Sequence, residues 1–111
     1  MAYSEPLAAR VREVISGIEG EVTERKMFGG LAFMLNGHMF TGIVGDELML
    51  RLGEHGAEAA LRREYVREMD FTGRPMKAMV FVGPAGLDGD AIGEWVTSAA
   101  AFTQSLPRKS R

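Results

Sequence analysis

Cysteine is absent from this chain of 111 residues. Its absence excludes a disulfide framework, a thiolate zinc site and a cysteine nucleophile, and it fits the reducing cytoplasm. Long apolar runs are also lacking: no segment approaches about 18 uninterrupted apolar residues, so the sequence predicts no membrane span. The N-terminus has no cationic start followed by an apolar core, and so it does not resemble a secretory signal. These absences together predict a cytoplasmic protein.

Charge of one sign is lacking as well, because 13 basic and 15 acidic side chains give a formal net charge of −2. Domains that mainly bind nucleic acid are usually basic. Direct DNA binding is therefore the weakest functional hypothesis, and we expect no nucleic acid as a direct partner. The basic side chains between residues 62 and 77 are interpreted as a solvated face. They are Arg62, Arg63, Arg67, Arg74 and Lys77.

The chain carries none of the common catalytic or metal-binding patterns. Its two histidines, His38 and His55, have no partner at metal-ligand spacing. The glycine pair at residues 29 and 30 lacks the Gly-Lys-Ser/Thr that would complete a phosphate loop, and the nucleophile-elbow, zincin and EF-hand patterns are missing. We therefore predict no catalytic residue, no metal and no cofactor, and a protein that is not an enzyme.

Tight turns and apolar strands are what the sequence does contain. The stretch from Met27 to Leu52 predicts three strands joined by two-residue turns, where glycine supplies the positive φ that primed hairpin turns require. A further glycine pair before the first of these strands predicts a bulge or a tight turn. The residues assigned to these turns are Gly29, Gly30, Asn36, Gly37, Gly45 and Asp46. In the third strand, Glu47, Met49 and Arg51 alternate with leucines and are expected on a wetter face.

Three helices complete the pattern. Ser4 is expected to cap a first helix, whose apolar stripe runs from Leu7 to Ile18. A short helix is expected over residues 54–65, with Arg62 and Arg63 at its end, and Asp88 is expected to cap a last helix. Residues 66–73 are ambiguous between strand and loop, and 78–82 predict a short buried strand.

This element order predicts the fold class. Grouped strands flanked by helices favour an α+β fold with an antiparallel sheet of about five to six strands, in the order α-β-β-β-β-α-β(β)-α. The length fits one domain over residues 1–111. The basic tail over residues 106–111 is expected to be frayed. Self-association into a homodimer is a further expectation, through sheet edges or apolar strand faces.

Eight methionines are a high count for this length. Met34, Met39 and Met49 lie in the predicted strands. Methionine is an adaptable core filler, and it also suits a pliable surface for partner binding. Both interpretations stay open on the sequence alone.

A small-anion or small-ligand site is the alternative function, either as a binding protein or as an enzyme. His38, Arg74 and Lys77 are its candidate residues, in a pocket between sheet and helices. Its test is whether the three side chains converge on one cavity.

The order and spacing of several short motifs resemble the N-terminal domain of the TfoX/Sxy competence-regulator family. The resemblance covers roughly residues 22–102. The residues that carry it are Met27-Phe28-Gly29-Gly30, Asn36-Gly37 with Met39-Phe40, Gly45-Asp46-Glu47-Leu48, Phe71-Thr72-Gly73-Arg74-Pro75-Met76-Lys77, and the helix with Trp95.

The resemblance implies a curved antiparallel sheet with flanking helices, akin to type III secretion chaperones. It also implies regulation of natural competence through transcription-factor partners, and it brings no established catalytic residues. Full-length regulators carry a second, C-terminal domain, which this sequence lacks, so a single-domain member is expected. The leading hypothesis is thus a non-enzymatic protein-interaction module, a transcription or competence regulator that acts through an unidentified protein partner.

Overall fold

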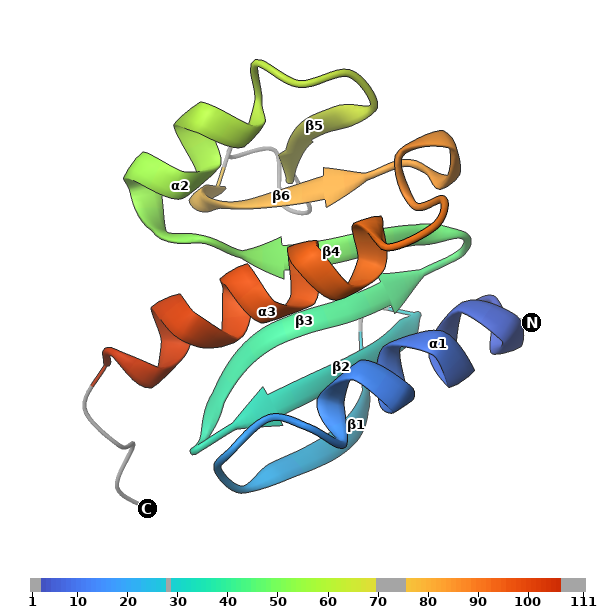
Figure 1. Ribbon diagram of the computed structural model, residues 1–111, viewed down its shortest axis with the longest axis vertical. Coiled ribbons are helices and arrows are strands. Elements are labelled where there is room, and N and C mark those ends of the chain that lie inside the picture. Colours follow the sequence, from blue (N-terminus) through green and yellow to red (C-terminus); the bar gives the residue numbers. More distant parts are fainter. Residues whose placement is uncertain (1–2, 28, 70–75, 107–111) are drawn as a thin grey trace.

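A computed structural model describes residues 3–27, 29–69 and 76–106. Within these ranges the chain forms one six-stranded antiparallel sheet, in the spatial order β1-β2-β3-β4-β6-β5, and three α-helices. The α+β class and the predicted element order are confirmed (Figure 1). The elements are α1 (Glu5–Ile15), β1 (Val22–Met27), β2 (Gly30–Leu35), β3 (His38–Val44), β4 (Glu47–Arg51), α2 (Gly53–Ala60), β5 (Val66–Met69), β6 (Met76–Val82), the 3-10 turn η1 (Pro84–Gly86) and α3 (Ala91–Gln104).

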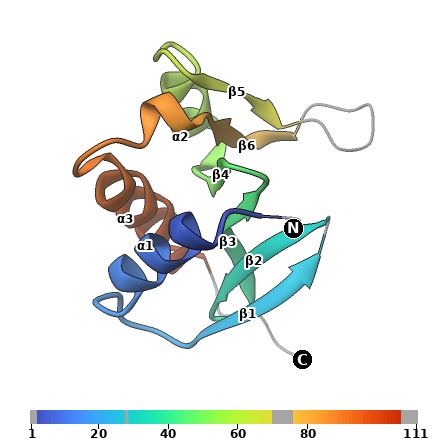
Figure 2. The ribbon, with the colours of Figure 1, turned by 90° about the vertical axis from the view of Figure 1, so that its right-hand side faces the viewer.

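Helices α1 and α3 lie side by side on one face of the curved sheet (Figures 1 and 2). Helix α2 follows β4 and packs against β6 at one end of the sheet. The main core fills the space between these helices and the sheet. Its members include Phe33, Phe40 and Leu50 from the strands, and Trp95 and Val96 from α3.

Helix α1 begins where the sequence predicts. The Ser4 hydroxyl accepts a hydrogen bond from the Leu7 backbone N–H at 3.3 Å, which satisfies one of the free donors of the first turn. Leu7 and Val11 are buried, as the helical stripe requires. The helix ends at Ile15, so Ile18 lies beyond it, although its side chain still packs on the core.

Tight turns join the central strands. Asn36 and Gly37 between β2 and β3 both have positive φ, 53° and 90°, which is the signature of a type I′ turn. Between β3 and β4, Gly45 has φ 61° and Asp46 is the second turn residue. The left-handed backbone at these positions explains the glycine at each turn.

The second face of the sheet carries a smaller apolar cluster, away from α1 and α3. Met49, Met79 and Phe81 are its buried members, with Met39 and Val44 packed against them. Met49 is only 2% exposed. The prediction of a wetter environment for Met49 is therefore wrong, because β6 pairs with β4 and sets Phe81 beside it.

Two helix boundaries differ from the sequence prediction. Helix α2 ends at Ala60, not at residue 65, so Arg62 and Arg63 lie in the turns that follow it. Helix α3 follows Asp90, and Asp88 contributes only its carbonyl, which accepts the Ala91 N–H at 3.1 Å. A side-chain cap from Asp88 is therefore a wrong prediction.

The ambiguous stretch after residue 65 contains strand β5, which pairs with β6. Most of the predicted basic tail lies outside the described residues. None of the helices in the described part of the chain is both long and apolar enough to cross a membrane.

Candidate interaction site

A surface pocket of about 560 Å³ lies between the end of α2 and the segment from η1 to α3. We call it the arginine–tryptophan pocket. It combines two arginines, two carboxylates and two aromatic side chains. The lining residues are Arg62, Arg63, Glu64, Tyr65, Ala85, Gly86, Asp88, Ala91 and Trp95.

An arginine stacked on a tryptophan lines this pocket. Trp95 lies on the buried side of α3 and is 7% exposed. The guanidinium carbon of Arg63 lies 4.5 Å from the centre of the Trp95 ring, a geometry that gives a favourable cation–π contact. The early end of α2 makes this possible, because the Arg63 N–H donates to the Ala60 carbonyl at 2.9 Å in the turn that closes the helix. The stack therefore joins the end of α2 to α3.

Tyr65 also lines the pocket, and its backbone conformation is unusual. Its φ is 69°, in the left-handed region, which costs a non-glycine residue about 1 kcal/mol or more. Its carbonyl accepts the Gly83 N–H at 2.7 Å, which fixes this conformation. A Cβ at Gly86 would lie 3.2 Å from the Tyr65 Cβ, so a glycine there permits the close approach.

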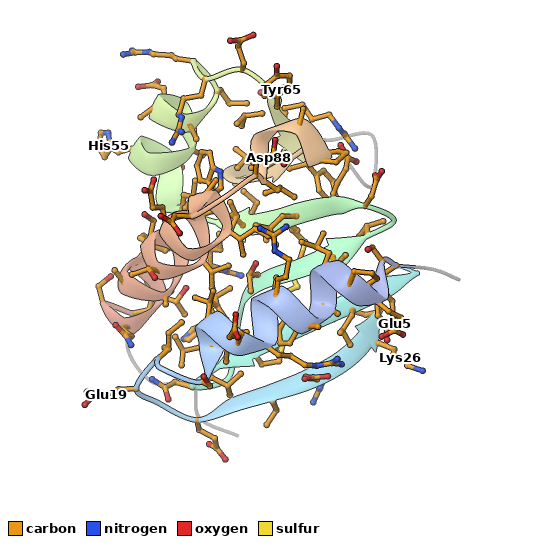
Figure 3. The ribbon with its side chains drawn as sticks, turned by 45° about the vertical axis from the view of Figure 1, so that its right-hand side comes forward. Glu5, Glu19, Lys26, His55, Tyr65 and Asp88 are labelled. Carbon is orange, nitrogen blue, oxygen red and sulfur yellow. The ribbon has the colours of Figure 1, made fainter. Side chains whose placement is uncertain are left out.

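The Tyr65 side chain nevertheless faces solvent. Tyr65 is 55% exposed and is the exposed large hydrophobic residue of the described ranges. Figure 3 shows Tyr65 and Asp88 at the same end of the molecule. A strained backbone therefore holds a tyrosine of which more than half is accessible to solvent.

The charged groups of the pocket are not paired with one another. The ion pairs found among the described residues, Arg12–Glu24 and Arg67–Glu47, lie elsewhere. Within those residues Arg62 forms neither a side-chain hydrogen bond nor an ion pair, and the stack on Trp95 is the side-chain interaction of Arg63. Both guanidinium groups therefore keep donors for an external acceptor.

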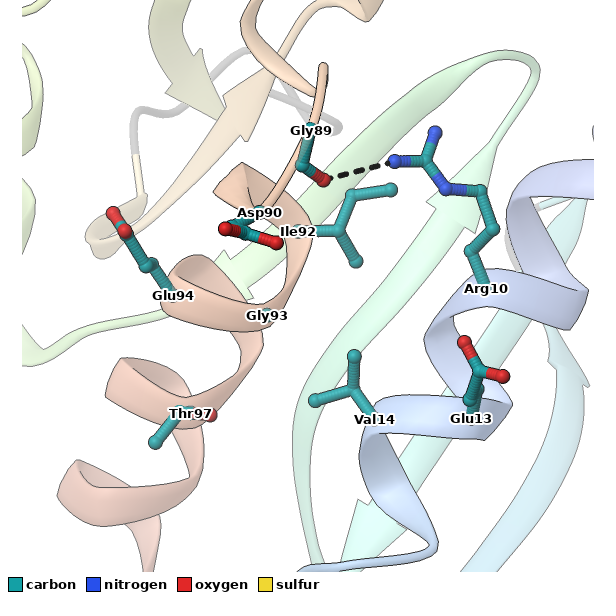
Figure 4. Close-up of a pocket in the computed structure, with 9 residues that line it drawn as sticks. All are labelled: Arg10, Glu13, Val14, Gly89, Asp90, Ile92, Gly93, Glu94 and Thr97. Carbon is teal, nitrogen blue, oxygen red and sulfur yellow. Dashed lines mark hydrogen bonds between the residues drawn. The ribbon is translucent and has the colours of Figure 1, made fainter.

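A second, open groove of about 480 Å³ lies between α1 and α3 (Figure 4). Arg10 is held there by the carbonyls of Leu87 and Gly89, to which its Nη2 donates at 3.2 and 3.3 Å. Arg10 thus links α1 to the segment before α3. The groove is otherwise acidic, and no three metal-ligating side chains converge anywhere in the described ranges. Its carboxylates are Glu13, Asp90 and Glu94.

The two ion pairs found among the described residues lie outside both cavities. Arg12 donates to both carboxylate oxygens of Glu24, at 2.8 and 2.9 Å, and ties α1 to β1. This hydrogen bonding lowers the pKa of Glu24 and raises that of Arg12. On the second face, Arg67 bonds to Glu47, which raises the pKa of Arg67, and its guanidinium lies 4.6 Å from the centre of the Phe81 ring.

The methionines proposed for partner contacts lie in different environments. Met49 is a core residue of the second face. Met34 and Met39 are half-buried and are paired across β2 and β3. Partner contact by Met34 and Met39 stays a prediction, whereas Met49 has almost no surface to offer.

The three residues of the predicted anion site are not brought together by any described contact. His38 begins β3 and is half-buried, and it lines neither of the two cavities above. Arg74 lies outside the described residues. Lys77 belongs to β6, but its side chain is not among the described ones. A site formed by these three residues stays a prediction.

Comparison with known families gives the assignment. The TfoX N-terminal domain matches this chain over residues 13–103. The chain belongs to this family. The resemblance inferred from the hairpin motifs is therefore confirmed. No curated protein matches the chain.

The matched region of this TfoX domain includes the whole arginine–tryptophan pocket. Sequence reasoning missed the pocket as a site. The sequence predicts a solvated face for Arg62 and Arg63, and it assigns no function to Tyr65 or Trp95. The single tryptophan of the chain was the available signal, because tryptophan is enriched where proteins make their strongest contacts.

Proposed function

We propose that this TfoX domain is a non-enzymatic protein-interaction module that regulates transcription or competence through protein partners. Family membership supports the proposal, since the TfoX N-terminal domain is not known as an enzyme family. The observation that carries it is the exposed Tyr65 ring beside the Arg63–Trp95 stack. Tryptophan, tyrosine and arginine are the residue types that dominate binding energy at protein interfaces.

The architecture suits such a role. The pocket is formed by segments anchored to rigid elements, because α2 packs on β6 and Trp95 is fixed on α3. A pocket held in place before binding loses little conformational entropy when a partner docks. The two half-buried methionines of β2 and β3 would offer a second, adaptable contact surface.

Affinity capture from the native cell, followed by mass spectrometry, tests the module. We expect the tagged wild-type domain to enrich the same few proteins in repeated experiments, and an unrelated domain of similar size and charge to enrich none of them. Failure to enrich any protein, together with a successful turnover assay on a small substrate, would contradict the proposal.

The regulatory part needs a separate measurement. Transcript levels in a strain that lacks the gene should differ from wild type and should be restored by the intact domain. An unchanged transcriptome under conditions that induce DNA uptake would refute a regulatory role, even where partners are captured.

A further inference from the structure

We propose that the arginine–tryptophan pocket docks a peptide segment of a partner protein in which one carboxylate lies next to a large apolar or aromatic side chain. The inference rests on the proposed function and names the surface and the chemistry of the contact. It uses three observations: the stacked Arg63, the exposed and strained Tyr65, and the balance of charge around the pocket.

Arg63 is prepared for a carboxylate. A guanidinium stacked on an aromatic ring keeps its in-plane N–H donors free, and these donors match the two oxygens of a carboxylate. The contact with Trp95 also holds the guanidinium group over the ring before the partner arrives. Arg62, on the same turn, provides a second cation without a partner among the described residues.

Tyr65 is the reason to expect an apolar group in the partner segment. Asparagine or glycine would accept the left-handed backbone at this position more readily than tyrosine does. Tyrosine nevertheless occupies this strained position, and more than half of the residue is left exposed by the fold. Strain of this kind is found at functional sites. The ring is therefore assigned to contact with an external apolar group.

The charges around the pocket further restrict which partner segments can bind there. Glu64 and Asp88 line the same pocket as the two arginines, so the four formal charges cancel. A run of acidic residues or a nucleic-acid backbone would meet these carboxylates and be repelled. A single carboxylate can pair with Arg63 while its apolar neighbour contacts Tyr65, and it meets less of this repulsion than a run of acidic residues would.

The test begins with random peptides displayed on phage and selected against the whole domain. We expect enriched sequences to share an aspartate or glutamate next to an aromatic or leucine residue. An enriched peptide is then synthesised, together with a copy in which the carboxylate is an amide. Trp95 is the single tryptophan of the chain, so its fluorescence reports binding at the pocket without a label.

Matched variants locate the site. Arg63→Gln and Tyr65→Asn should each weaken binding of the peptide by about tenfold or more, and so should the amide copy of the peptide. Tyr65→Phe should bind within about threefold of wild type, because it keeps the ring. Arg25→Gln removes an exposed arginine of β1, far from the pocket, and should bind as wild type does. Urea unfolding of each variant confirms that it is folded.

The failures of the two proposals are distinguishable. Enriched peptides without a carboxylate, or equal binding by Arg63→Gln, Tyr65→Asn and wild type, would overturn the docking proposal. If Arg63→Gln and Tyr65→Asn still capture the wild-type partners from the native cell, the module stands and its contact surface lies elsewhere. A dimer that is lost in Tyr65→Asn would make a second copy the occupant and would also overturn the proposal.

Discussion

Replacing Gly30 by alanine should lower the stability of this domain, whereas replacing Gly93 by alanine should raise it. Gly30 begins β2, and a Cβ built there would lie 2.1 Å from the backbone oxygen of Ile43 in β3. Gly93 lies in α3 beside the open groove toward α1, and, apart from its chain neighbours and the backbone of its own helix, a Cβ there would meet no atom within 4 Å. The two substitutions to alanine are chemically identical, so the difference between them reports the local structure alone.

The expected magnitudes follow from these distances. For Gly30→Ala, the β2 and β3 backbones would have to separate by about 1 Å, and such overpacking is expected to cost about 3 kcal/mol. For Gly93→Ala, no contact opposes the methyl group, and the alanine lowers the conformational entropy of the unfolded chain. Helix propensity then predicts a gain of about 0.5–1 kcal/mol.

Urea unfolding followed by Trp95 fluorescence measures both changes. Trp95 is 7% exposed and its environment changes on unfolding, which makes it a suitable probe. Thermal unfolding gives a second reading, since 1 kcal/mol corresponds to a shift of roughly 4 °C for a domain of this size.

Either variant can refute the reasoning. A Gly30→Ala protein within about 0.5 kcal/mol of wild type would mean that β2 and β3 do not approach closely at this position. A destabilised Gly93→Ala protein would mean that the groove between α1 and α3 is closed in solution.

Three further predictions concern single interactions. The Arg12–Glu24 pair lowers the pKa of Glu24 from 4.5, so its contribution to stability is present above that pH and is lost as the pH falls through the lowered value. Both side chains are about 40% exposed, so Glu24→Gln should lower the free energy of unfolding by only about 0.5 kcal/mol at pH 7, and this difference should shrink as the pH falls through the lowered pKa. Thr41→Val should cost about 1–2 kcal/mol in urea unfolding, whereas Thr41→Ser should retain most of the stability, because the buried hydroxyl donates to the Met49 carbonyl at 2.7 Å. Arg10→Met should lower the free energy of unfolding by about 1 kcal/mol through loss of its two bonds to backbone carbonyls, and an unchanged value would contradict the proposed link between α1 and α3.

Local chemistry explains which parts of the fold are predictable from sequence. The turn at Asn36 and Gly37 requires positive φ at both residues, and few residue types accept it, so the sequence itself carries the signal. The Ser4 cap is likewise decided within one turn of helix. The element order then follows from the spacing of such signals along the chain.

Long-range contacts explain the parts that were not predictable. Helix α2 ends early although the residues after Ala60 are good helix formers. The Tyr65 carbonyl instead accepts a hydrogen bond from Gly83, which is distant in sequence. Met49 is buried because β6 lies beside β4, an adjacency that skips β5 and that alternation within β4 cannot reveal. The pocket also depends on a long-range contact, because the end of α2 must lie against α3 before Arg63 can stack on Trp95.

Strand β1 forms one outer edge of the sheet, and its central residues are exposed. Suppose that two copies of β1 pair edge to edge, antiparallel, about a two-fold axis perpendicular to the sheet. Directly opposite residues must point to the same face of the sheet, so the residue on the axis lies opposite the same residue of the other copy. At the centre of β1 that residue is Glu24 or Arg25, and like charges placed directly opposite one another are destabilising. Symmetric pairing of the β1 edge with its own copy is therefore disfavoured when it is centred on either of these residues.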